Sequence, residues 1–263
     1  MIWAIGGLLA AGLLMWLAIW HIQARRQIGK LEQALESASR GLEQLQHAFE
    51  RFAPQQVVEE IIARGSSTKG ERREVTVLFA DLVGFTAMCE APDPEQIVNV
   101  LNGYFQAMSR AVTTYSGRVS KFIGDGLMAL FGAPEPNPWQ TIDAVKAALA
   151  MREALVEYNK KLAEQGISPL ALGIGIHKGS VVAGVIGSSE LMEFTVIGDV
   201  VNTASRIESL TRKHGVDILV SAEVREALDD RFVVRAMPLE EVKGKTGKLV
   251  TYTVEGFHEN VSR

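Results

Sequence analysis

The chain has a single cysteine, Cys89, among its 263 residues. One cysteine excludes an intrachain disulfide framework, and without a surrounding Cys/His cluster we expect it to pack as a small apolar residue. Basic residues are not in excess, because 27 Lys and Arg stand against 31 Asp and Glu, a formal net charge of -4. This balance argues against a nucleic-acid-binding protein. The length allows one sizeable domain with an appendage, not two full domains.

Charge is missing altogether from residues 1–20, MIWAIGGLLAAGLLMWLAIW. A helix of this length spans about 30 Å, the thickness of a hydrocarbon core, and its tryptophans lie toward its ends. The sequence therefore predicts a transmembrane helix. Arg25, Arg26 and Lys30 follow at once, which places the rest of the chain in the cytoplasm and the protein at the plasma or inner membrane. The alternative is a cleaved signal peptide, but no basic start or small-residue cleavage site is evident.

A heptad pattern follows the predicted span, and we interpret residues 21–52 as a coiled-coil signalling helix. Its apolar positions are Ile28, Leu31, Leu35, Ala38, Leu42, Leu45, Phe49 and Phe52. Such a narrow seam is buried best against a copy of itself, which predicts a parallel dimer, although packing on the chain's own domain stays open. Residues 53–73, with Pro54 near their start and a polar Gly/Ser stretch, are expected to be a transducing element and linker.

Strand and helix patterns alternate from residue 74 to residue 256, and residues 257–263 form a tail. The mixture of hairpins and helix crossovers indicates an α+β sandwich rather than a doubly wound sheet. One expected hairpin joins strands 118–123 and 127–131, and a second joins strands 170–176 and 181–186. Helices are expected at 94–115, 141–164 and 199–214. The remaining expected strands are 75–80, 193–197, 217–220, 232–236 and 249–254.

Two aspartates share one kind of setting. Asp81 follows the apolar strand VTVLFA, and Asp125 lies at the tip of the hairpin KFIGDGLMAL. Buried carboxylates need cations, and two of them converging from adjacent strands suit Mg²⁺, which takes few carboxylates together with substrate phosphates. Asp-Gly is also a favoured hairpin pair, so Asp125 alone could be only a turn residue.

The turn after Asp81 adds a second feature. Gly84, Phe85 and Thr86, in LVGFT, are expected to expose backbone N–H groups next to the metal, a cradle for phosphate oxygens. Metal ions beside a phosphate cradle indicate a nucleoside triphosphate and a displacement at phosphorus.

Five segments in order carry a family resemblance: FADLVGFT, KFIGDGLMALFG, GIGIHKG, FTVIGDVVNTASRIE and VKGKTGKLVTY. Together they resemble the catalytic domain of class III adenylyl cyclases, of the bacterial, membrane-anchored, homodimeric kind. The resemblance implies a ferredoxin-like βαββαβ sheet with helices on one face, and a head-to-tail dimer with sites at the interface. It also implies conversion of ATP to 3′,5′-cyclic AMP and pyrophosphate by in-line attack of the ribose 3′-hydroxyl on the α-phosphate.

The resemblance assigns roles residue by residue. Asp81, Asp125 and the Leu82 carbonyl match the ligands of two Mg²⁺ or Mn²⁺ ions. Asn202 and Arg206, four apart and hence on one helix face, match the pair that orients the ribose and neutralises charge on the α-phosphate. Lys243 matches a phosphate-binding lysine, although a Gly/Lys loop is also ordinary surface.

Base choice follows from two further matches. Lys121 matches the base-reading lysine, which donates to adenine N1, and Thr195 its partner, which accepts from N6. Guanine presents donors at this edge and favours a carboxylate, so Lys121 argues for ATP. The Lys/Thr pair resembles the subgroup that includes bicarbonate-responsive cyclases. Leu191 departs from the arginine common in that subgroup, which puts phosphate binding or bicarbonate response in doubt.

The resemblance also implies composite sites, in which one chain supplies Asp81 and Asp125. The other chain supplies Lys121, Thr195, Asn202 and Arg206. Two non-enzymatic interpretations remain. A degenerate cyclase domain could sense nucleotides, with Leu191 as its only support, or a membrane-tethered coiled coil could act as a scaffold. A diguanylate cyclase is disfavoured, because the turn reads IGDG and the GG-acid-acid-F signature is absent.

Overall fold

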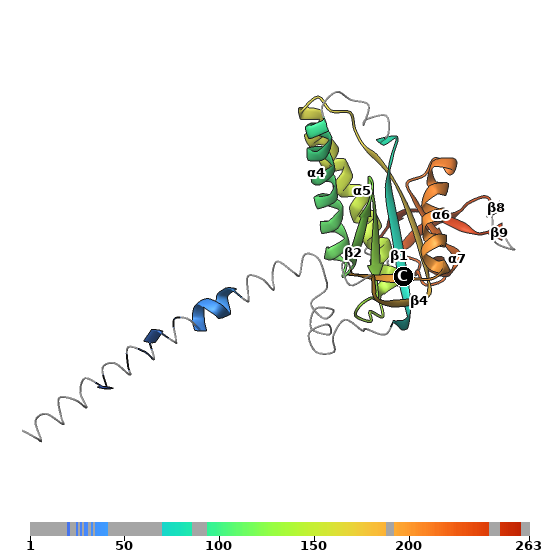
Figure 1. Cartoon of the computed structure of the whole chain (residues 1–263). Helices are drawn as coiled ribbons and strands as arrows, with labels where there is room; N and C mark the ends of the chain where they lie inside the picture. The colour runs from blue at the N-terminus through green and yellow to red at the C-terminus, as the bar shows by residue number, and fades with distance from the viewer. Residues whose placement is uncertain are drawn as a thin grey trace, which may run out of the picture. The chain divides into compact units, whose positions relative to one another are not determined.

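The computed structural model describes residues 70–85, 94–187, 192–241 and 248–258, together with a subset of helical positions between 20 and 41. The chain divides into two compact units, residues 1–59 and residues 60–263. Figure 1 shows the second unit as a sheet with helices packed against it.

The first part of the sheet is a βαββαβ unit. Within it the strand order is β2-β3-β1-β4, and every neighbouring pair is antiparallel. This is the order of a ferredoxin-like sheet, so the predicted α+β fold is confirmed. Its elements are β1 (Glu71–Val83), α4 (Pro94–Thr114), β2 (Arg118–Ile123), β3 (Gly126–Phe131), α5 (Gln140–Glu164) and β4 (Ala171–Gly187).

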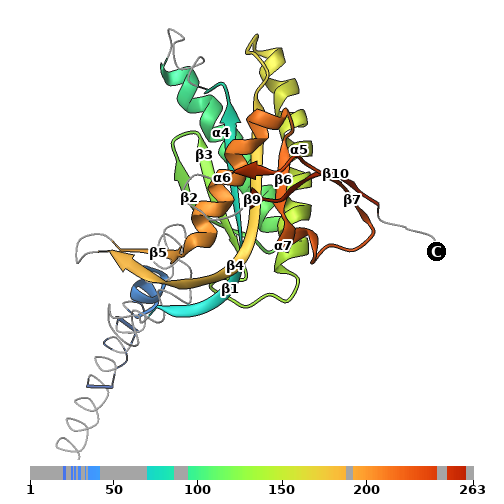
Figure 2. The same ribbon diagram turned by 90° about the vertical axis from the view of Figure 1, so that its right-hand side faces the viewer.

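The rest of the chain extends this sheet beyond β4 (Figure 2). β6 pairs with β4 in parallel, β10 and β7 follow as antiparallel neighbours, and β5 pairs with a further stretch of β4. The sheet is therefore mixed and has eight strands. The added elements are β5 (Met192–Ile197), α6 (Asp199–His214), β6 (Ile218–Ser221), α7 (Ala222–Arg225), β7 (Phe232–Ala236) and β10 (Thr251–Phe257), with a separate hairpin of β8 (Glu240–Glu241) and β9 (Lys248–Leu249).

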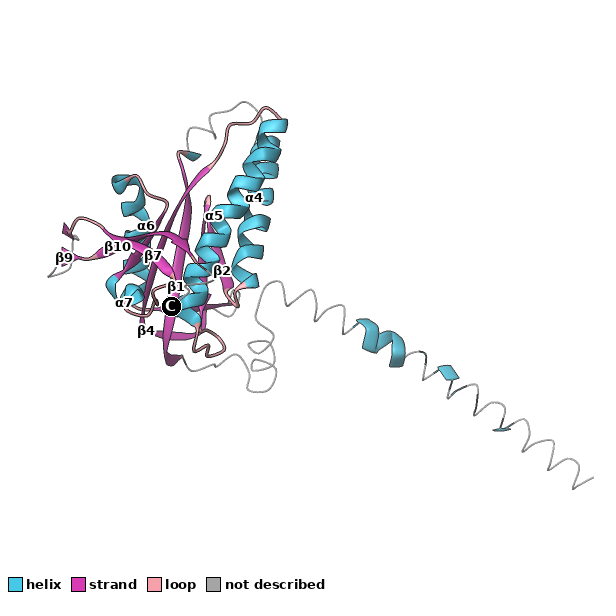
Figure 3. Ribbon diagram, turned by 180° about the vertical axis from the view of Figure 1, so that it is seen from behind, coloured by secondary structure: helices cyan, strands magenta, loops and turns pink. Residues whose placement is uncertain are grey.

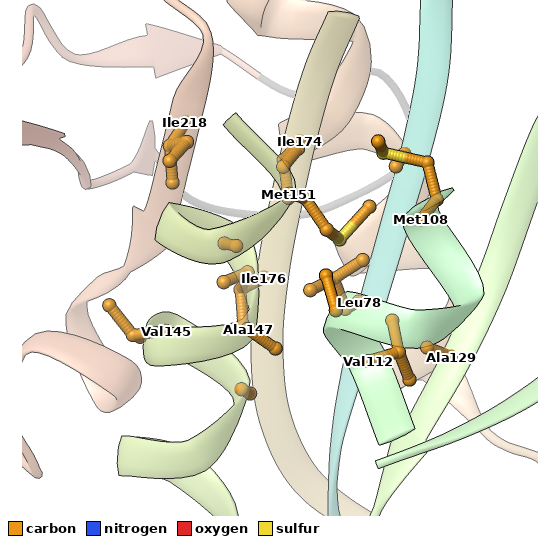
Figure 4. Packing of buried hydrophobic residues seen from close by; sticks show 14 of the residues in the cluster. Leu78, Met108, Val112, Ala129, Val145, Ala147, Met151, Ile174, Ile176 and Ile218 are labelled. Carbon is orange, nitrogen blue, oxygen red and sulfur yellow. The ribbon is translucent and has the colours of Figure 1, made fainter. Parts of the chain in front are cut away.

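Helices α4 and α5 lie side by side and cover one face of the sheet (Figure 3). Figure 4 shows Leu78 and Ile176 from the strands meeting Met151 of α5, with Met108 and Val112 of α4 beside them. All five side chains are fully buried. The alternation of strand residues sends the even-numbered side chains of β1 into this core and the odd-numbered ones to the other face.

Helix α6 covers that other face. Val200 and Ala204 of α6 pack with Val75 and Val77 of β1. The contact with β4 is so close that a Cβ on Gly175 would lie 2.5 Å from the Ala204 carbonyl oxygen. The expectation of helices on one face therefore holds for the βαββαβ unit only, because α6 lies outside that unit and packs on the opposite face.

The second predicted hairpin is wrong. Residues 171–187 form one continuous strand, β4, because it pairs with β1 without interruption from Ala171 opposite Val83 to Ala183 opposite Glu71. Gly179 simply occupies a ladder position opposite Val75. The same long pairing makes β1 begin at Glu71, inside the predicted linker. The hairpin at Asp125 and the helix at 199–214 are confirmed.

The predicted membrane span and most of the heptad seam lie outside the described residues. In the parts of the chain that the structure describes, no helix combines the length and the apolar character needed to cross a bilayer. The described positions between 20 and 41 are helical, and Leu35 of the seam is 73% exposed within the single chain.

Candidate active site

Asp81 and Asp125 are brought together by the pairing of β1 with β3. Ala80 lies opposite Leu127, so the end of β1 runs beside the β2–β3 hairpin whose turn holds Asp125. Gly124 takes a left-handed conformation in that turn (φ 61°), which glycine adopts without steric cost. A Cβ on Gly126 would lie 2.8 Å from Asp81 Oδ1, so the glycine leaves room for the carboxylate.

The electrostatics of this corner favour a cation. Burial, and after it the charge of Asp81, raises the pKa of Asp125, although backbone hydrogen bonds from Asp125 itself and from Leu82 and the charge of Arg212 act in the opposite direction. Burial and the charges of Asp81, Asp125 and Glu208 also raise the pKa of Tyr104, which lies on α4. Three acidic side chains thus concentrate negative potential around one end of β1.

The two aspartates fit a Mg²⁺ or Mn²⁺ site of the predicted kind. No group of three or more Asp, Glu, His or Cys side chains converges as a metal site among the described residues. Mg²⁺ commonly binds one or two carboxylates and completes its coordination with substrate phosphates and water. The neighbouring carboxylates of Asp81 and Asp125 offer oxygen ligands for such a site.

Arg212, which the sequence analysis did not single out, forms an ion pair with Asp81 Oδ2 from the last turn of α6. The same guanidinium lies 3.5 Å from Glu208 Oε1. No sequence pattern links residues 131 positions apart, so this contact depends on α6 packing across β1 and β4.

The predicted phosphate turn is described in part. Gly84 has φ 76°, in the left-handed region, where glycine is favoured, and Phe85 packs against the main core. Thr86, Lys243 and Leu191 lie outside the described residues. The strand leading to Lys243 is anchored to α6, because Lys213 Nζ lies 2.5 Å from Glu240 Oε2 of β8.

Lys121 lies on β2 and Thr195 on β5, and Glu193 of β5 links the two strands. Lys121 Nζ donates to the carboxylate of Glu193 at 2.9 Å. Glu193 and Thr195 are two residues apart on β5 and therefore lie on one face of the strand. A bulge between Val119 and Lys121 shifts the register of β2 at this point, a device that re-aims side chains. Glu193 was missed from the sequence, although the two-residue period of a strand could have suggested it.

Asn202 and Arg206 both lie on α6, and within the described residues neither forms a hydrogen bond or an ion pair with another side chain. At 3.6 residues per turn, these two residues form a stripe roughly 120° around the helix from the stripe of Glu208 and Arg212. Because Arg212 contacts Asp81 of the same chain, Asn202 and Arg206 project in a different direction.

Known proteins resemble this chain in sequence. The pattern of the family described as "Adenylate and Guanylate cyclase catalytic domain" matches residues 68–256. The chain is 35% identical over 239 residues to an adenylate cyclase of Anabaena cylindrica, covering 87% of this chain and 47% of the relative. It is 31% identical over 210 residues to adenylate cyclase 1 of Rhizobium meliloti, covering 79% and 32%. The chain thus spans about half or less of the length of these relatives.

Solved structures show the same fold. The guanylyl cyclase Cya2 superimposes with a TM-score of 0.69 at 38% identity, covering 74% of this chain and 98% of that one. The adenylyl cyclase CyaB from P. aeruginosa gives a TM-score of 0.68 at 31% identity, covering 74% and 100%. With the family pattern covering residues 68–256, this chain belongs to the adenylate and guanylate cyclase catalytic-domain family, the class III nucleotidyl cyclases.

Proposed function

We propose that the protein is an adenylate cyclase, a phosphorus-oxygen lyase that converts ATP to 3′,5′-cyclic AMP and pyrophosphate. The ribose 3′-oxygen bonds to the α-phosphorus and loses its proton, while the bond from the α-phosphorus to the bridging oxygen breaks. The bridging oxygen leaves with pyrophosphate, so no other reactant is needed. Named adenylate cyclases among the relatives support this assignment.

The observation that carries the choice of ATP is Lys121. Its ammonium group can donate to the unprotonated N1 of adenine, whereas N1 of guanine carries a proton and repels a donor. Thr195, on the same face of β5 as the carboxylate that holds Lys121, can accept from the adenine N6 amine. The solved relatives include both adenylyl and guanylyl cyclases, so the base is argued from these residues.

The other site residues take the remaining tasks. Asp81, Asp125 and the Leu82 carbonyl would hold two Mg²⁺ or Mn²⁺ ions, which neutralise phosphate charge and make the ribose hydroxyl more acidic when bound. Backbone N–H groups of the turn at Gly84 and Phe85, with Thr86 and Lys243, would hold the phosphates. Asn202 would orient the ribose, and Arg206 would stabilise negative charge that builds on the α-phosphate.

The geometry of α6 supports a homodimer with shared sites. Arg212 points to the Asp81 of its own chain, and the stripe of Asn202 and Arg206 points elsewhere. A second chain could then supply Asn202, Arg206, Lys121 and Thr195 to the aspartates of the first. The exposed Leu35 of the heptad seam supports a parallel coiled coil that raises the effective concentration of the two domains.

A guanylyl cyclase is the second candidate. The specific observation for it is Glu193, a carboxylate beside the base-reading position that could accept from guanine N1–H and the N2 amine. The ion pair with Lys121 opposes this, because it occupies the carboxylate.

The test is product formation by the full chain from ATP and from GTP, with Mg²⁺ and with Mn²⁺. Cyclic AMP from ATP, lost in Asp81→Ala, supports the proposal, and cyclic GMP alone supports the second candidate. A folded dimer that binds ATP without forming product would identify a nucleotide-sensing regulator instead.

We also propose that residues 1–20 anchor the protein in the plasma or inner membrane, with the catalytic domain in the cytoplasm. The uncharged run and the arginines after it support this. Fractionation of the full chain against a chain lacking residues 1–20 tests it, since only the full chain should sediment with membranes and resist extraction by high salt.

A further inference from the structure

Asp81 has a cation from its own chain as a partner. Arg212 Nη2 forms an ion pair with Asp81 Oδ2, the carboxylate assigned above to the metal site. Among the described residues, Arg212 is the only basic side chain that forms an ion pair with Asp81. A divalent cation bound to Asp81 would meet a positive charge already placed on one of its ligand oxygens.

Glu208 offers the same guanidinium a second partner. It lies one helical turn before Arg212, in the favourable Glu-to-Arg order, and its Oε1 is 3.5 Å from Arg212 Nη2. The Glu208 side chain is only 7% exposed, so water cannot solvate it well. Its Oε1 has no hydrogen-bond donor within the described residues, while Ser209 donates to Oε2 at 3.3 Å.

Arg212 is thus placed between two carboxylates and completes its contact with only one of them. A movement of a few tenths of an ångström or a rotation of the guanidinium would bring it within 3.0 Å of Glu208 Oε1, the ordinary length of such a hydrogen bond. That shift would free Asp81 Oδ2 and supply the missing donor to Glu208. The change keeps the buried carboxylate of Glu208 neutralised.

We propose that Arg212 is an internal counter-ion of the metal site, which occupies Asp81 when the metal is absent and transfers to Glu208 when a divalent cation binds. The inference rests on the proposed function in one respect, since it takes Asp81 as a metal ligand. Arg212 and Glu208 are positioning residues here. They act on the substrate only through Asp81, and together they set the metal concentration at which the site fills.

Binding of Mn²⁺ to the full chain without nucleotide tests this directly, with free Mn²⁺ measured by its paramagnetic resonance signal. Arg212→Met keeps the aliphatic stem and removes the charge, so the metal no longer competes with it. The dissociation constant is expected to fall on the order of tenfold. Arg212→Lys keeps the charge and is expected to bind Mn²⁺ close to the wild-type level. Unchanged or weaker binding in Arg212→Met would overturn the inference.

Glu208→Gln is expected to change the Mn²⁺ dissociation constant in the opposite direction. Without a charged acceptor, Arg212 stays on Asp81, and the Mn²⁺ dissociation constant is expected to rise about threefold or more. The effect should depend on Arg212, so Glu208→Gln in the Arg212→Met background should change binding by less than about twofold. Equal effects of Glu208→Gln in both backgrounds would show simple loss of negative charge and would contradict the transfer.

Two controls separate this inference from the proposed function. Arg231→Met breaks a comparable exposed pair with Asp229 (2.6 Å) and is expected to leave Mn²⁺ binding unchanged. Asp81→Ala is expected to abolish the site, and wild-type binding in that variant would overturn both the metal assignment and this inference. Cyclic AMP formation together with an Asp81-dependent site that Arg212→Met does not tighten would overturn the inference alone.

Discussion

The ammonium group of Lys121 lies 2.9 Å from the carboxylate of Glu193, which joins the hairpin that carries Asp125 to strand β5 and Thr195. The pair is partly exposed, so its electrostatic contribution to stability is small. Its effect is geometric, because the ion pair gives a lysine with four rotatable bonds a fixed direction at the position proposed above to read the base.

Reversing the charge at Lys121 is expected to change which nucleotide the protein prefers. In Lys121→Glu, two carboxylates would face the adenine N1 acceptor, and kcat/KM for ATP should fall about a hundredfold or more. Carboxylates accept from guanine N1–H and N2, so the ratio of GTP to ATP turnover should rise. Steady-state rates with both nucleotides measure this, and an unchanged ratio would mean that Lys121 does not contact the base.

A milder change keeps Lys121 and removes only its ion-pair partner, Glu193. Glu193→Gln keeps the shape but loses the ion pair, so KM for ATP should rise about three- to tenfold with a smaller change in kcat. The matched control is Glu157→Gln, which breaks the exposed pair with Lys160 (2.6 Å) on α5 and should leave both constants unchanged. If kcat in Glu193→Gln fell as much as kcat/KM, Glu193 would instead have a role in the chemical step.

Some of these features could be predicted from local patterns in the sequence, and others could not. Helix α6 and the hairpin at Asp125 were predictable, because a 3.6-residue period and a Gly-Asp-Gly turn are local signals. The turn predicted at His177 and Gly179 was wrong, because pairing with the long strand β1 keeps β4 extended through these residues. The contacts of Arg212 with Asp81 and of Lys121 with Glu193 join distant segments, and no local pattern encodes them.

The close packing of α6 on β4 makes Gly175 sensitive to substitution. A Cβ at this position would lie 2.5 Å from the Ala204 carbonyl oxygen and 2.6 Å from Glu208 Cα, both backbone atoms that cannot rotate away. Gly175→Ala is therefore expected to lower the free energy of unfolding by about 1 to 3 kcal/mol and to displace the helix that carries Asn202 and Arg206. Gly256→Ala is the control, since its Cβ would meet nothing within 4 Å. Urea unfolding compares the two, and equal stabilities would show that α6 can shift without cost.

Asp125→Asn separates a metal ligand from a mere turn residue. Asparagine tolerates the same turn, so a structural role for Asp125 predicts little change in activity. A ligand role predicts loss of activity by about a hundredfold or more. In either case the metal-free Asp125→Asn protein is expected to be slightly more stable, because burial and the charge of Asp81 raise the pKa of Asp125 and thus disfavour its carboxylate in the folded state.

The size of this stability change depends on pH. An acid whose pKa is raised by folding binds its proton more tightly in the folded state, so its contribution to stability is full at low pH and is lost as the pH rises through the raised pKa. The neutral asparagine should therefore stabilise the metal-free protein at neutral pH, by a few tenths of a kcal/mol after allowance for solvent screening, and the gain should vanish as the pH falls below about 4. Asp229→Asn should show the opposite sign at neutral pH, because hydrogen bonds from Arg231 lower the pKa of Asp229. Thermal unfolding in a chelator measures both, and a less stable Asp125→Asn that retains activity would leave Asp81 as the only carboxylate ligand of this corner.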